Sequence, residues 1–204
     1  PESPLFKEDY ALKWTEFDPD KANEMLDALG LDKRDDDDIR LLPDGRPMNI
    51  IVETAGEDTE QTDVLELVHD GWAEVGIKLF TKPSQREVFR NRIFSGETLI
   101  SIWGGFENGL PTPGMNPAEL APTSQQSLQW PKWGQHFETK GQAGEAPDMP
   151  NAQALAVLNA QWLVATDDKV RTDIWQQMLQ IHADETFTIG IVAGVMQPVV
   201  TSGK

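Results

Sequence analysis

The chain has 204 residues, of which 39% are hydrophobic and 25% are charged, as in ordinary globular proteins. Its formal net charge of −17 repels phosphate backbones, so nucleic acid is excluded as an expected partner. The absence of cysteine excludes disulfides, thiol catalysis and thiolate metal sites. No apolar run reaches the ~18 residues of a membrane span, so we expect that the chain does not itself cross a membrane.

The first strong pattern is EFDPDKANEMLDALGL, which predicts a helix within residues 16–31. Asp18 is a suitable N-cap, Pro19 suits the first helical position, and Gly30 suits a left-handed stop. The next segment, DKRDDDDIRLLPDGR, is typical of a solvated acidic loop or hairpin. A calcium loop is the weaker alternative, because the oxygen spacing and central glycine of an EF-hand are missing.

A strand, a capped helix and a second strand follow with short connections. MNIIVETAG and IKLFTK are rich in β-branched and other apolar residues, and the helix between them ends at Gly76. This order predicts a βαβ unit. We expect residues 47–55 and 77–82 to be neighbouring or near-neighbouring parallel strands, with the 59–76 helix crossing over one face.

The remaining chain alternates helices and strands around one long segment of weak periodicity. A helix at about 84–94 leads to a strand that ends at Trp103. Residues from about 104 to 150 are expected to be irregular, and such long loops are usually functional or disordered. Two helices, at about 151–166 and 168–184, and two closing strands, at about 186–194 and 195–202, complete the pattern. The alternation predicts an α/β fold with a mainly parallel or mixed sheet flanked by helices.

Residues of enzymatic chemistry are not grouped in this sequence. His69, His136 and His182 have no second ligand at a spacing typical of a metal site. No nucleophile elbow, P-loop or dinucleotide fingerprint is present. We therefore expect no catalytic residue, no metal and no cofactor. A two-carboxylate hydrolase using Glu107 and Glu119 is kept as an alternative, although nothing in the sequence pairs them.

Tryptophans outside the helical patterns are the best candidates for a binding role. Trp103 ends a strand, and Trp130 and Trp133 lie in QWPKWG. Such large, rigid, amphipathic rings suit stacking on a ligand. The alternative is that they cover the edge of a core from outside.

Three segments follow one another in the chain: EFDPDKANEMLDALGL, then VLELVHDGWAEVGIKLF, and then a strand that ends in Trp before a Gly/Asn/Pro loop. In this order they resemble the large extracytoplasmic solute-binding proteins of ABC transporters, in the peptide/oligopeptide/nickel-binding family. The resemblance implies a periplasmic-binding-protein-like lobe without enzymatic activity. It also implies a small-molecule or peptide ligand, enclosed between two lobes and delivered to a membrane permease.

The resemblance further implies that residues 1–204 form a single lobe, the second and carboxy-terminal one of the two. We expect an excised piece of a longer precursor, whose export signal and first lobe lie outside this sequence. The implied location is periplasmic, or extracytoplasmic on a lipoprotein anchor. A ligand-sensing domain of a regulator, built on the same type of lobe, is the second reading.

In peptide-binding members, the loop after this strand carries a Trp followed by an Asp that holds a ligand ammonium. Here Phe106 and Glu107 stand where that acid is expected, a departure from recognition of a peptide amino terminus. The ligand classes that remain are sugars, opines and short peptides. The implied ligand-binding residues are Trp103 for stacking, Gly104 and Gly105 for close backbone approach, Glu107 and Asn108 for polar orientation, and Trp130 and Trp133.

Overall fold

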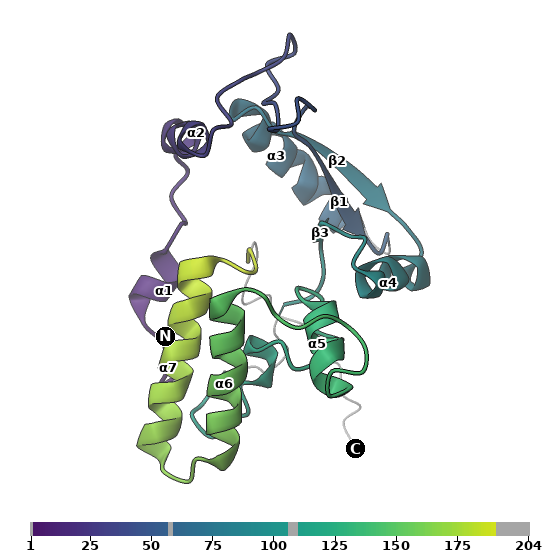
Figure 1. The fold of residues 1–204 in the computed structure, drawn as a ribbon. Coiled ribbons are helices and arrows are strands. Elements are labelled where there is room, and N and C mark those ends of the chain that lie inside the picture. The colour runs from purple at the N-terminus through teal and green to yellow at the C-terminus, as the bar shows by residue number, and fades with distance from the viewer. Residues whose placement is uncertain (1, 57–58, 106–109, 191–204) are drawn as a thin grey trace, which may run out of the picture.

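The computed structural model describes residues 2–56, 59–105 and 110–190. A part built from strands and helices lies above a helical part in the view of Figure 1. The elements in chain order are α1 (Glu8–Leu12), α2 (Pro19–Ala28), β1 (Asn49–Thr54), α3 (Glu60–Glu74), β2 (Lys78–Pro83), α4 (Arg86–Ser95), β3 (Ile100–Ser101), the 3-10 helix η1 (Ala118–Leu120), α5 (Pro131–Glu138), α6 (Pro150–Val164) and α7 (Asp168–Glu185).

The caps predicted for α2 are confirmed. The side chain of Asp18 accepts a hydrogen bond of 2.9 Å from the backbone N–H of Lys21, and Pro19 is the first helical residue. Gly30 follows the helix with φ of 82°, a conformation that glycine adopts without strain. Local chemistry is therefore enough to start and stop this helix.

The predicted βαβ unit is also confirmed. Strands β1 and β2 are parallel neighbours, with Asn49 opposite Lys78, and α3 lies between them in the chain. Strand β3 pairs with the other side of β1, also in parallel, which gives the order β2-β1-β3. Side chains of Val52, Leu65 and Leu79 form the core between the sheet and α3.

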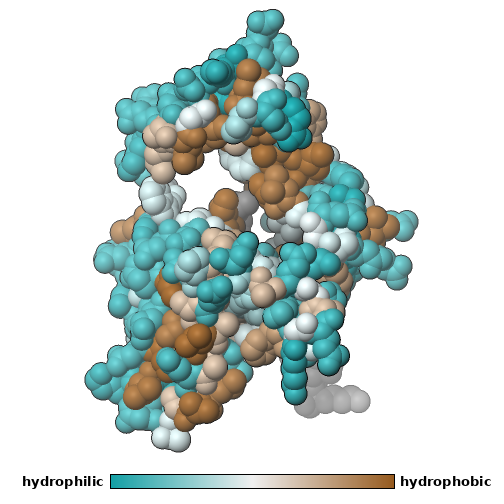
Figure 2. Space-filling view, in the orientation of Figure 1, coloured by the Kyte–Doolittle hydropathy of each residue, from teal (hydrophilic) through white to brown (hydrophobic). Residues whose placement is uncertain are grey.

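The three strands of the described sheet are all parallel, which agrees with the mainly parallel form of the expected sheet, and no antiparallel strand joins them among the described residues. The expected closing strands at about 186–194 and 195–202 fall largely on residues 191–204, which lie outside the described residues. On the sheet, Ile51 of β1 and its register partner Phe80 of β2 are both exposed. Figure 2 shows hydrophobic side chains gathered on the upper part where it is turned toward the helical part.

The helical part has a larger core, built mainly by α6 and α7. Leu155 and Met178 are fully buried there. The indole N–H groups of Trp162 and Trp175 each donate a 2.9 Å hydrogen bond, to the carbonyls of Pro113 and Met115. These bonds fasten the segment after β3 onto the two helices. The stretch 104–150, expected to be irregular, contains the helices η1 and α5.

An ion pair between a buried carboxylate and a partly exposed guanidinium joins the sheet to α4. Glu53 of β1 is buried, and both its carboxylate oxygens accept 2.8 Å hydrogen bonds from the Arg92 guanidinium. These hydrogen bonds hold the pKa of Glu53 below its ordinary value of 4.5. A group whose pKa is depressed on folding stabilises the fold above its ordinary pKa, and that contribution is lost as pH falls through the folded-state pKa.

We therefore expect Glu53→Gln to lower stability at pH 7, and the difference from the wild type to shrink as pH falls below about 4.5. Urea unfolding midpoints measured between pH 7 and pH 3 test this. Glu66→Gln, which removes an exposed carboxyl of α3, is the matched control. A difference that stays constant over this pH range would show that the carboxylate charge of Glu53 is not what stabilises the fold.

Candidate functional site

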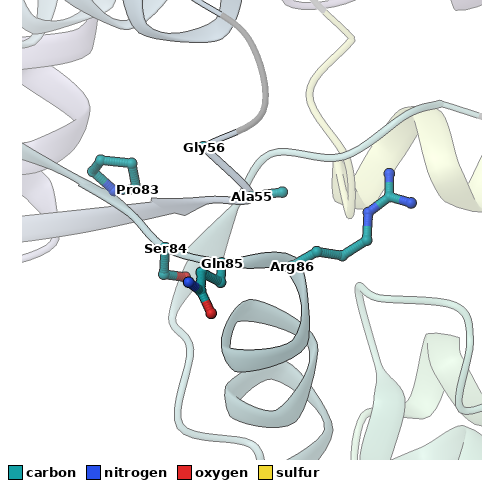
Figure 3. A pocket seen from close by; sticks show the side chains of 6 residues that line it. All are labelled: Ala55, Gly56, Pro83, Ser84, Gln85 and Arg86. Atoms are coloured by element: carbon teal, nitrogen blue, oxygen red, sulfur yellow. The ribbon is translucent and has the colours of Figure 1, made fainter.

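The carboxyl ends of β1 and β2 meet the start of α4 at a pocket of about 470 Å³. Figure 3 shows its lining from close by. Gly56 follows β1 with φ of 64°, and a Cβ there would lie 3.2 Å from the Ser84 carbonyl oxygen. Glycine thus lets the two strand ends approach closely. The lining residues are Ala55, Gly56, Pro83, Ser84, Gln85 and Arg86.

Trp103 lies just beyond β3, at the same edge of the sheet. Its ring stacks on Phe89 of α4, with centroids 5.6 Å apart and an angle of 22° between the ring planes. The guanidinium of Arg86 lies 5.2 Å from the Trp103 ring centroid, in a cation–π contact. The tryptophan nevertheless remains 38% exposed. An aromatic ring is therefore held in place at the pocket edge while keeping free surface.

Polar groups also reach this edge. The hydroxyl oxygen of Ser84 is buried and has no hydrogen-bond partner among the described residues. Arg86 supplies a cation next to it, extending away from Ser84 and Gln85 in Figure 3. A fixed, partly exposed ring beside a cation suits the binding of a polar solute with a flat or ring-shaped face.

Only some of the residues predicted to bind a ligand lie at this edge of the sheet. Trp103 is at the edge of the pocket. Among the described residues, nothing lies within 4 Å of a Cβ added at Gly104 or Gly105, so their role in close backbone approach stays a prediction. Glu107 and Asn108 lie outside the described residues.

Trp130 and Trp133 belong to the helical core instead. Trp130 is only 4% exposed and packs with the buried side chains of α6 and α7, and Trp133 is partly buried against the same cluster. Their rings stack on each other with centroids 6.4 Å apart. Because the Trp130 ring is buried in this core and Trp133 packs on it, we do not include Trp130 or Trp133 in the proposed binding site.

Sequence reasoning missed Ser84, Gln85 and Arg86. A usable signal was present, because these three residues come directly after the second strand of the βαβ unit. Open α/β sheets bind ligands outside the carboxyl ends of their strands. The same rule that selected Trp103 after the third strand therefore applies to this segment.

Two negative findings bear on the site. Over residues 2–56, 59–105 and 110–190, no group of three or more His, Asp or Glu side chains is arranged to hold a metal ion. Within the same described ranges, none of the helices combines the length and apolar character needed to cross a bilayer.

Comparison with solved structures shows the fold. The oligopeptide-binding protein OppA matches with a TM-score of 0.75 and 25% identity, over 91% of this chain and 31% of OppA. The periplasmic binding protein MelB of Agrobacterium fabrum C58, in complex with stachyose, matches with a TM-score of 0.69 and 19% identity, over 85% of this chain and 25% of MelB. NikA of Brucella suis, in complex with Fe(III)-EDTA, matches with a TM-score of 0.60 and 22% identity, over 89% of this chain and 34% of NikA.

This chain thus spans between a quarter and about a third of these proteins. No curated protein sequence matches it. The model of one family, described as "Bacterial extracellular solute-binding proteins, family 5 Middle", matches residues 1–127, which is more than half of the chain. By this match and by its fold, the chain belongs to family 5 of the bacterial extracellular solute-binding proteins.

Proposed function

We propose that this chain is one lobe of an ABC-transporter substrate-binding protein, which captures a small solute between two lobes and delivers it to a membrane permease. The observation that carries the proposal is the partly exposed Trp103 ring, fixed on Phe89 at the carboxyl edge of a parallel sheet and next to a pocket. The proposed location is outside the cytoplasm, as in the family's description. Binding and release involve no catalysis.

The proposed solute is a small polar molecule, such as a short oligosaccharide, an opine or a short peptide. An indole face stacks well on a sugar ring or a planar group, and Arg86 offers a charged polar contact beside it. Among similar structures, OppA is named for oligopeptides and the MelB structure contains stachyose. The departure at Phe106 and Glu107 leads us to rank sugars and opines beside peptides.

Replacing Trp103 by alanine is expected to weaken solute binding by about 1–3 kcal/mol, because a stacked aromatic is lost while the fold is kept. The solute is first identified by native mass spectrometry of the full-length protein as purified. Calorimetry then compares the affinities of the wild type and the variant.

Trp14→Ala is the control, since Trp14 is 58% exposed and precedes α2, away from this edge in the chain. It should leave the affinity unchanged. If Trp103→Ala folds normally and binds as tightly as the wild type, the carboxyl edge is not the solute site.

A further inference from the structure

A second pocket, of about 420 Å³, lies between α1, η1 and α7. None of its lining residues is shared with the pocket at the sheet edge. Figure 1 shows α1 and α7 side by side in the helical part, whereas the sheet and α4 belong to the upper part. The second pocket is therefore a separate feature of the chain.

Most of its wall is apolar and fixed in place. Pro117, Leu179 and the ring of Trp175 line it. The Trp175 indole N–H donates to the Met115 carbonyl at 2.9 Å, which sets the orientation of the ring. The Tyr10 hydroxyl, also in the lining, is 3.0 Å from the Gln176 side-chain oxygen. This surface can accept an aliphatic chain of several carbons.

One wall carries a carboxylate whose hydrogen-bonding capacity is not used. Glu119 lines the pocket, and its Oε2 atom is buried with no hydrogen-bond partner among the described residues. A buried polar atom without a partner is costly, and more so when it carries charge. A cationic donor placed in the pocket would remove that cost.

The one histidine in the lining does not supply the missing positive charge. His182 Nε2 lies 2.8 Å from the Leu120 carbonyl oxygen, to which its N–H donates. Burial lowers the pKa of His182 below its ordinary value of 6.5, so the ring is neutral at pH 7. The net charge of −17 further favours cations over anions near this surface.

We propose that this second pocket binds a primary aliphatic ammonium compound. The ammonium group donates to the Glu119 carboxylate and lies near the Trp175 ring, which also lines the pocket and attracts cations. The alkyl chain packs on Pro117 and Leu179. This proposal does not depend on the solute site at the sheet edge.

The probe for the test is n-hexylammonium at pH 7, compared with hexan-1-ol and hexanoate, which keep the chain and change the head group. Calorimetry on the full-length protein should show that hexylammonium binds, hexanol binds much more weakly and hexanoate does not bind. Glu119→Gln should weaken hexylammonium binding by about tenfold or more, because a charged hydrogen bond becomes a neutral one. Glu66→Gln, at an exposed position of α3, should not weaken it.

Three outcomes would overturn the proposal: no binding of hexylammonium, equal affinity for hexanol, or an unchanged affinity in a folded Glu119→Gln variant. If circular dichroism shows that Glu119→Gln does not fold, Ala183→Phe, which fills the pocket from α7, decides instead by abolishing binding or leaving it unchanged. Trp103→Ala should leave hexylammonium binding intact, so failure here is distinguishable from failure of the solute site.

Discussion

Replacing Arg40 by methionine is expected to destabilise the protein by about 3–5 kcal/mol, the range for breaking a buried charged network. Arg40 is only 1% exposed. Its Nε donates to the Val75 carbonyl at 2.7 Å, and its two terminal nitrogens donate to Asp27 Oδ1 at 2.5 Å and to Asn23 Oδ1 at 2.6 Å. The carbonyl of Leu31 accepts a further bond.

Methionine keeps most of the aliphatic stem but donates no hydrogen bond, so these acceptors lose their shared partner. Urea unfolding at pH 7 measures the change. Arg46→Met is the matched control: the Arg46 side chain is 75% exposed and pairs with Asp44 on the surface, so its loss should cost no more than about 1 kcal/mol. Equal effects of the two substitutions would mean that the Arg40 contacts contribute little.

The role of Arg40 could not be predicted from its surroundings in the sequence. It follows four successive aspartates, and this run is typical of a solvated loop. Its hydrogen-bond partners lie in α2, in the segment just after α2, and at Val75, the residue after α3. The bond to Val75 joins residues that are 35 positions apart. Burial of this kind depends on how distant elements meet, which local composition does not encode.

Patterns that act over a few residues were predicted well. The Asp18 cap and the Gly30 stop need only their own neighbours, and parallel pairing of β1 and β2 follows from a helix joining two strands. Helix α5 was missed, although Pro131 occupies its first position. Gly134, which argues against a helix, lies within it because a Cβ there would be 2.0 Å from the Ser124 carbonyl oxygen.

The same difference between local and distant contacts explains why only part of the candidate site was predicted. Trp103 was found because it closes an apolar stretch predicted to be a strand, and the structure places it two residues beyond the end of β3, at the sheet edge. The position of Arg86 after the second strand was a usable signal, but its contact with the Trp103 ring joins residues of two different elements and could not be predicted locally. Trp130, flanked by Gln and Pro, has the local sequence of a loop residue, and its burial depends on residues distant in the chain, mainly those of α6 and α7.

Trp130→Ala is therefore expected to act on stability, in contrast to Trp103→Ala. The ring of Trp130 packs edge-on against Phe187 with centroids 5.3 Å apart, and against His182 at 5.8 Å, besides stacking on Trp133. Truncating so large a buried side chain removes these contacts and leaves a cavity, at a cost of about 3–5 kcal/mol. Urea or thermal unfolding of the variant measures this cost.

Trp130→Phe separates ring packing from the polar atom of the indole. The Trp130 Nε1 atom is buried without a hydrogen-bond partner among the described residues, so phenylalanine removes a donor that makes no bond there. It keeps an aromatic ring against Trp133 and Phe187, and we expect a loss below about 1.5 kcal/mol. A Trp130→Ala variant as stable as the wild type but defective in solute binding would contradict this assignment. It would return Trp130 to the binding surface, because a ring that contributes nothing to the core is free to contact a ligand.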